Sequence, residues 1–186
     1  MSETGTEQVQ DGVARQRQIE AVVREYQQPL LRYATRLLRN ATLAQDAVQG
    51  ALIKLARQWQ PSQRAGPHLK QWLFRVTHNE AVDLIRSEET RRRVHAESAE
   101  AMPGSARPGS AEHQFGDVAE DRHALVLATL HVLTSGERQV VLLRLQQGMS
   151  YDEIAAVTNR PRNTVGVMLH QAVKKLSAKI RGKENP

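Results

Sequence analysis

The sequence contains no cysteine, which excludes disulfides, thiol nucleophiles and cysteine-ligated zinc. Aromatic residues make up only 4% of the chain, so a core must consist mainly of Leu, Val, Ile and Ala. No apolar run approaches the roughly 18 residues of a membrane span. The polar residues 1–18 also lack the apolar centre of a signal peptide. These absences predict a cytoplasmic protein that does not insert into a membrane.

Signals of enzymatic chemistry are missing as well. The sequence has no glycine-rich phosphate loop, no GxSxG and no HExxH. Its seven histidines are scattered without metal-ligand spacing, and we expect most of them at the surface. We therefore expect no enzyme, no cofactor and no metal site.

Basic residues are in excess. The chain has 26 Lys and Arg against 20 Asp and Glu, a formal net charge of +6, which favours a polyanionic partner. Its 186 residues allow one large or two small domains at roughly 150 residues per domain.

Helical periodicity covers most of the chain, and no stretch alternates with period two, so we predict an all-α fold. Around residue 100 the sequence turns to Ala, Gly, Ser, Pro and Glu, a composition that forms no core and predicts a flexible linker. We therefore expect two small helical domains. The predicted segments are a polar tail 1–18, a domain 19–95, a linker 96–118, a domain 119–180 and a tail 181–186.

Three helices are predicted in the first domain. Pro29 starts, kinks or divides the first of them. Apolar residues between Leu43 and Trp59 form one stripe of the second, and Thr42 with Gln45 makes a capping box at its start. The third runs from Leu69 to about Arg93.

Residues 150–176 carry the sharpest local signal, a helix-turn-helix pattern. Ser150 and Glu153 form a capping box before a short helix, and Asn159 suits the left-handed backbone of the turn. From Arg160 to Lys183 there are seven Lys or Arg and no Asp or Glu. An ordinary helical hairpin with a solvated basic face is the alternative, but cap, turn and charge together favour duplex DNA binding. The candidate contacts are Arg160, Arg162, Asn163, Thr164, Val167, His170, Gln171, Lys174 and Lys175.

The helix from Leu69 carries a second candidate surface. At about 100° per residue, Trp72, Arg75, Asn79 and Arg86 share one stripe, a combination that suits unpaired bases. Taken alone, the stripe fits a core Trp bordered by surface Arg side chains better. The polar segment 60–67 before this helix can form a loop over a base. The candidate single-strand contacts are Arg64, Trp72, Arg75, His78, Asn79 and Arg86.

A third candidate surface lies on the helix between Leu43 and Trp59. Ile53 stands in the middle of its polar side, which also carries Asp46 and Gln49. A single exposed Ile usually has no special meaning, but one ringed by polar groups can anchor a protein–protein contact.

Taken together, these segments resemble the extracytoplasmic-function (ECF) group of bacterial RNA polymerase sigma factors. Residues 46–54 are similar to a family pattern close to DLVQETFLK, and residues 72–86 to WLFRIARNLALDLLR. Residues 133–144, followed by residues 151–155, are similar to the family's region 4. The resemblance covers roughly residues 19–95 and 119–180, in the family's order.

This resemblance implies an alternative sigma factor that binds core RNA polymerase and promoter DNA. The first domain would dock on the polymerase through Asp46, Gln49 and Ile53 and capture melted minus-10 bases. The second would read the minus-35 duplex. The factor would be a monomer when free, would leave the chemistry to the polymerase, and can have an anti-sigma factor as a further partner.

Two departures from the family patterns stand out. Gly50 replaces a Glu on the polymerase-facing surface, and a glycine weakens a helix interior by roughly 0.5–1 kcal/mol relative to Ala. In the recognition helix, where the family often reads TVKSRLHRARKKL, four basic positions become Gly166, Met168, Gln171 and Val173.

Two other functions compete with this interpretation. A stand-alone helix-turn-helix regulator would bind duplex DNA without polymerase. An interaction module with an incidental basic face would show little salt-dependent affinity for DNA. The stripe from Trp72 to Arg86 and the face around Ile53 favour the sigma factor.

Overall fold

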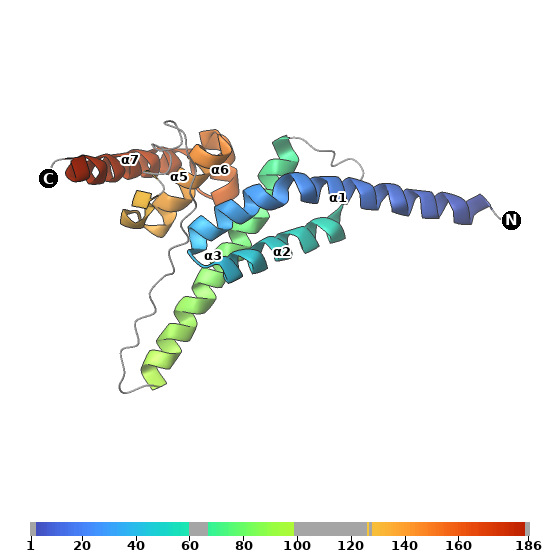
Figure 1. The fold of residues 1–186 in the computed structure, drawn as a ribbon, viewed down its shortest axis with the longest axis horizontal. Coiled ribbons are helices and arrows are strands. Elements are labelled where there is room, and N and C mark those ends of the chain that lie inside the picture. Colours follow the sequence, from blue (N-terminus) through green and yellow to red (C-terminus); the bar gives the residue numbers. More distant parts are fainter. Residues whose placement is uncertain (1–2, 60–66, 99–125, 127, 185–186) are drawn as a thin grey trace. The chain divides into compact units, whose positions relative to one another are not determined.

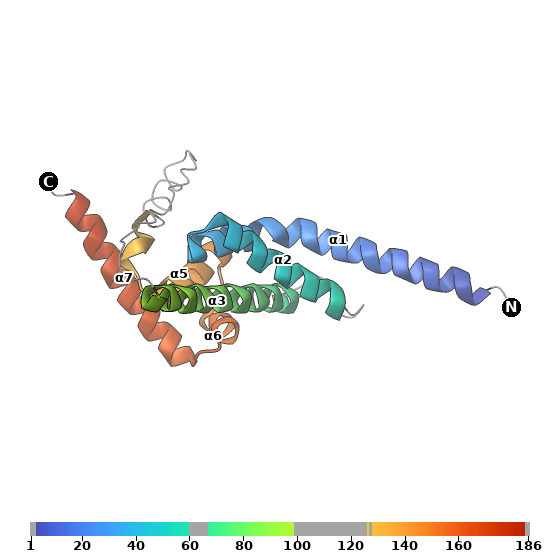
Figure 2. The ribbon, with the colours of Figure 1, turned by 90° about the horizontal axis from the view of Figure 1, so that it is seen from below.

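The computed structural model describes residues 3–59, 67–98, 126 and 128–184. Within these ranges every regular element is helical (Figures 1 and 2), which confirms the predicted all-α fold. The chain divides into two compact units, Met1–Ala101 and Met102–Pro186. Most of the predicted linker, residues 99–118, lies outside the described residues, as does Arg64.

The described part of the first unit consists of three helices that all contact one another: α1 (Glu3–Leu38), α2 (Ala41–Gln58) and α3 (Pro67–Ser98). Figure 2 shows α1 and α2 running together on one side of α3. Small residues on α2, Ala44, Ala47 and Ala51, are completely buried, so the helices approach one another closely. Large side chains complete this core from all three helices: Leu30, Tyr33, Leu55, Leu73 and Phe74.

The start of the first unit differs from the prediction. The segment 1–18, expected as a polar tail, belongs to α1 from Glu3 onward. Arg15 of this segment donates from Nη2 to the carbonyl oxygen of Ala56 on α2, over 2.8 Å. Pro29 lies inside the helix and does not end it. Its backbone nitrogen has no hydrogen to donate to the helix, but tertiary packing of the surrounding turns sustains the helix.

The cap of α2 is also a correction. Asn40, not Thr42, is the N-cap residue, and its side chain accepts a hydrogen bond from the backbone N–H of Leu43 over 3.1 Å. Asn40 takes the extended backbone that an N-cap requires, whereas Thr42 is already helical. The apolar stripe predicted for this helix is confirmed, since its members Ala47, Val48, Ala51 and Leu55 are buried.

The second unit contains the short helix η1 (Leu130–Val132) followed by α5 (Ser135–Gln147), α6 (Tyr151–Thr158) and α7 (Arg162–Glu184). Gly148 ends α5 in the left-handed conformation at φ 64°, which glycine adopts without steric cost. The predicted C-terminal tail from residue 181 begins later, because α7 continues to Glu184. The core of this unit is aliphatic and includes Leu142, Leu143, Ile154, Val157 and Val165.

None of the described helices combines the length and the apolar character that a membrane span needs.

Candidate nucleic-acid and protein interfaces

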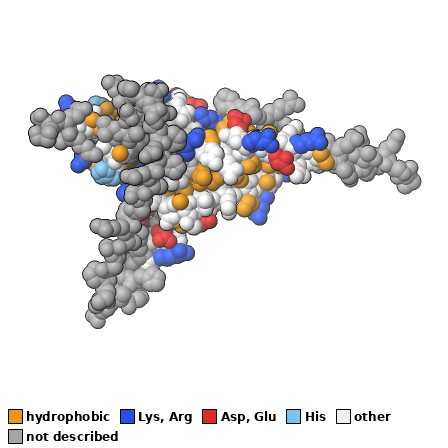
Figure 3. Space-filling model, in the orientation of Figure 1, with side chains coloured by type: hydrophobic (Ala, Val, Ile, Leu, Met, Phe, Trp, Pro, Cys, Tyr) orange, Lys and Arg blue, Asp and Glu red, His pale blue; other side chains and the backbone are white. Residues whose placement is uncertain are grey.

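The polar side of α2 presents an exposed apolar residue among charged and amide groups. Ile53 is 51% exposed, and Gln49 and Asp46, one and two turns before it, are exposed as well. Figure 3 shows hydrophobic, basic and acidic side chains interspersed along the described surface of this unit. The three predicted docking residues therefore lie together on one accessible face, which we call the α2 face.

The outer side of α3 carries the polar residues of the predicted base-binding stripe. Arg75, Asn79 and Arg86 are exposed, whereas Trp72 is half-buried. Arg86 lies 3.6 Å from Asp83, measured from Nη1 to Oδ1, and both side chains are more than 70% exposed. Such a solvated pair holds its partners weakly, so Arg86 remains available to a phosphate or a base.

His78 lies in the core and not at the surface. It is 5% exposed, and its Nδ1 is hydrogen-bonded to the hydroxyl group of Tyr33 on α1 over 3.0 Å. Burial raises the pKa of that Tyr33 hydroxyl above its ordinary value. Tyr33 also meets Phe74 edge to face, with ring centroids 5.6 Å apart. We therefore leave His78 out of the proposed DNA contacts, because its ring is buried and its Nδ1 is bonded to Tyr33 between α1 and α3.

The helix-turn-helix has the local geometry that the sequence predicts. The hydroxyl of Ser150 accepts from the backbone N–H of Glu153, and the Glu153 carboxylate accepts from the backbone N–H of Ser150 over 2.7 Å. Asn159 adopts the left-handed conformation at φ 52° and ψ 47°. This conformation turns the chain from α6 into α7, and the backbone N–H of Arg160 then donates to the carbonyl oxygen of Ala155.

The predicted duplex contacts form one exposed surface along the first turns of α7. None of them is buried; the exposed residues are Arg160, Arg162, Asn163, Thr164, Val167, His170, Gln171, Lys174 and Lys175. Val167 is 56% exposed. Arg162 pairs with Asp152 of α6 over 3.1 Å, from Nε to Oδ1, and both side chains are largely exposed. A phosphate can therefore compete for Arg162 at little cost.

The four positions of α7 that lack the family's basic residues differ in their exposure to solvent. Gln171 and Val173 are exposed, whereas Gly166 and Met168 are half-buried. A Cβ atom at Gly136 would come within 2.7 Å of the Met168 methyl group, so Met168 packs directly over the start of α5. Met168 therefore contributes to packing, and only Gln171 and Val173 change the chemistry of the open surface.

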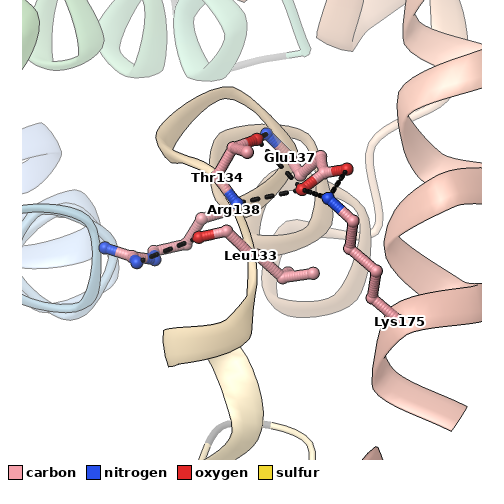
Figure 4. A network of polar contacts seen from close by, with 5 residues as sticks. All are labelled: Leu133, Thr134, Glu137, Arg138 and Lys175. Carbon is pink, nitrogen blue, oxygen red and sulfur yellow. Dashed lines mark hydrogen bonds and ion pairs between the residues drawn. The ribbon is translucent and has the colours of Figure 1, made fainter. Parts of the chain in front are cut away.

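A buried carboxylate joins α5 to α7 in the second unit (Figure 4). Glu137 is 4% exposed and closes a capping box with Thr134. Lys175 of α7 donates from Nζ to both oxygens of this carboxylate, over 2.7 and 2.8 Å. Burial alone would raise the pKa of Glu137, but the hydrogen bonds from Lys175 and Thr134 outweigh it and hold the pKa below its ordinary value.

Glu137 is not among the residues predicted from the sequence, although Thr134 and Glu137 carry the capping-box spacing. The partnership with Lys175 has no local signal, because the two residues lie on different helices. Lys175 is therefore held in an ion pair within the protein. No such ion pair is found for its neighbour Lys174 among the described contacts. Within the described residues, no group of three His, Asp or Glu side chains could hold a metal ion.

Known proteins resemble the chain along both units. The family described as Sigma-70 region 2 matches residues 22–91, and the family described as Sigma-70, region 4, matches residues 123–176. The RNA polymerase sigma-E factor of Streptomyces avermitilis is 31% identical, covering 90% of this chain and 87% of that protein. The ECF RNA polymerase sigma factor SigL of Mycobacterium tuberculosis is also 31% identical, covering 84% and 85%.

A solved structure shares the fold. The sigma factor RpoE from Bartonella quintana, crystallised with the anti-sigma factor NepR, superposes with a TM-score of 0.64 at 22% identity. The alignment covers 87% of this chain and 96% of that one.

Proposed function

The chain belongs to the extracytoplasmic-function group of RNA polymerase sigma factors, and we propose how its surfaces divide the work of promoter recognition. As an alternative sigma factor it directs transcription initiation. The α2 face with Asp46, Gln49 and Ile53 docks on core RNA polymerase. The exposed residues of α3 hold unpaired minus-10 bases, and the open surface of α7 reads the minus-35 duplex.

The exposure of Ile53 is the observation that favours a sigma factor over a stand-alone regulator. A helix-turn-helix unit alone explains duplex DNA binding. It does not explain an Ile that is half exposed between polar neighbours on a separate helical unit. Such a residue fits a protein partner that buries it, with Asp46 and Gln49 as the polar surround.

The remaining parts of the proposal follow from membership of the family. Sigma factors are non-enzymatic regulators, and we infer that this chain also leaves catalysis to the polymerase and takes no cofactor. We place it in the cytoplasm, where the polymerase works, as a monomer when free. An anti-sigma factor is a further partner in this proposal.

Run-off transcription with purified core polymerase on a promoter library tests the function. We expect specific transcripts only when both the chain and core are present. Gel-shift titration of the chain alone separates the competing functions, because a stand-alone regulator binds its duplex tightly without core. Tight duplex binding without core, together with no transcripts, would contradict the sigma assignment.

Replacing Asn79 by Ala should impair promoter melting more than duplex binding. Asn79 is exposed on α3 beside Arg75, and the loss of one hydrogen bond to a base corresponds to about fivefold in open-complex formation. Permanganate footprinting on linear and pre-melted promoters measures the effect. Ser87→Ala, an exposed change farther along α3, serves as the control. Wild-type reactivity of the Asn79 variant on both templates would reject base capture.

Two changes on α7 should separate base reading from phosphate binding. Gln171 can bond an adenine through two hydrogen bonds, and Gln171→Ala should relax preference at one or two positions by about 1–3 kcal/mol. Lys174→Ala should weaken all sequences alike and reduce the salt dependence. Promoter mutagenesis at several salt concentrations measures both. If Gln171→Ala weakens every promoter equally while Lys174→Ala alters base preference, the two roles are reversed.

A further inference from the structure

Gly50 leaves a space on α2 that a residue of α3 fills. A Cβ atom at Gly50 would lie 3.0 Å from Oε2 and 3.2 Å from Cδ of Glu80. These distances are tighter than ordinary van der Waals contact, so the carboxyl group of Glu80 occupies the place where a side chain of residue 50 would begin. This packing gives a reason for a glycine in the middle of α2, where it otherwise weakens the helix.

Lys54 fixes the carboxyl group in this place. Its ammonium group forms an ion pair with Oε1 of Glu80. Lys54 follows Gly50 by one helical turn, so a Glu at position 50 would face the same ammonium group as an i, i+4 pair. Glu80 therefore makes, from another helix, the contact that an acidic residue at position 50 would make within α2.

The family patterns differ from this chain at both positions. In DLVQETFLK the residue at position 50 is Glu, and in WLFRIARNLALDLLR the residue at position 80 is Leu. The chain has Gly50 and Glu80. The two residues that differ from the family patterns, Gly50 and Glu80, thus lie side by side in the structure. The carboxylate that the family pattern has on α2 comes here from α3.

We propose that Glu80 is a docking residue for core polymerase that supplies, from α3, the carboxylate that the α2 face lacks at Gly50. This inference rests on the proposed docking role of the α2 face. The Glu80 side chain is 26% exposed and that of Lys54 is 52% exposed, so part of the pair remains open beside Ile53. The matching chemistry on the polymerase is a basic side chain that pairs with this carboxylate while Ile53 is buried.

Removing and then relocating the carboxylate tests the inference. We expect Glu80→Ala to weaken binding of labelled full-length chain to core polymerase by about fivefold, the effect of one exposed ion pair. Because the charge lies near the rim, the loss should shrink as salt rises. The double variant Gly50→Glu with Glu80→Ala has room for the new side chain and should recover most of the lost affinity.

Asp83→Ala is the matched control, because it removes a more exposed carboxylate from the same helix and should leave core binding unchanged. Glu80→Gln keeps the shape of the side chain and should bind as weakly as Glu80→Ala, which separates loss of charge from loss of packing. Thermal unfolding checks that each variant is folded.

The outcomes distinguish the inference from the function on which it rests. Equal binding by Glu80→Ala and Asp83→Ala, or a double variant as weak as Glu80→Ala, would overturn the role of Glu80 while wild type still binds core. A wild-type chain that does not bind core at all would overturn the docking function together with the inference.

Discussion

Ile53→Glu is expected to weaken binding to core polymerase by about thirtyfold or more, the effect of losing an interface hot spot. The side chain is 51% exposed in the free chain, and its burial in a complex contributes favourable transfer free energy. A carboxylate in its place would have to leave water without a partner. Fluorescence anisotropy of the labelled chain titrated with core measures the affinity.

Two further variants define the extent of this docking surface. Asp46→Lys reverses a charge on the same side of α2 and should weaken binding less, with a marked salt dependence. Gln45→Glu also adds a carboxylate to α2, about a quarter-turn away from Ile53 on the helical wheel, and should bind as wild type does. Wild-type affinity of both Ile53→Glu and Asp46→Lys would show that the polymerase docks elsewhere.

Local signals made the second unit predictable from its sequence. Ser150 with Glu153, and Asn159 eight residues after the start of α6, specify a helix start and a left-handed turn within one short segment. These features depend only on neighbouring backbone groups, so the sequence contains all that is needed to predict them. The exposed surface of α7 follows from the same register, because buried Val165, Leu169 and Ala172 leave the opposite side open.

Features that depend on contacts between helices were not predictable. His78 is polar and was expected near DNA, but Tyr33 of another helix provides a buried hydrogen-bond partner. Glu80 gave no signal by itself, and its role becomes visible only beside Gly50 and Lys54. The N-terminal segment was not predicted to be helical for the same reason. Its composition is polar, and its helix is stabilised by a contact with another helix, the hydrogen bond from Arg15 to α2.

Glu137→Ala should destabilise the second unit by about 2–3 kcal/mol. The change removes a capping box, typically about 1 kcal/mol, and charged hydrogen bonds from Lys175 that contribute a further 1.5–3 kcal/mol or so. Lys175 is 44% exposed and water can solvate part of its charge, so we expect a total near the lower end. Urea unfolding of the full chain measures the loss, and hydrogen exchange of α5 and α7 amides assigns it to this unit.

Acid should remove the same contribution from the wild-type protein. The pKa of Glu137 lies below its ordinary value of 4.5 in the folded chain, so the folded state favours the carboxylate. The stabilisation is therefore complete above about pH 4.5 and is lost as pH falls through the lowered folded-state pKa. Glu137→Gln retains a side chain that can complete the capping box but cannot titrate.

The difference in stability between wild type and Glu137→Gln isolates this group from the other carboxylates. We expect the difference to be constant from neutral pH down to about pH 5 and to shrink at lower pH. Lys175→Met should show the same loss of pH dependence, because the carboxylate then lacks the ammonium group that lowers its pKa. A wild-type advantage over Glu137→Gln that persists unchanged in acid would mean that the pair between α5 and α7 does not hold this carboxylate ionised. The position of α7 on α5 would then depend on their apolar contacts alone.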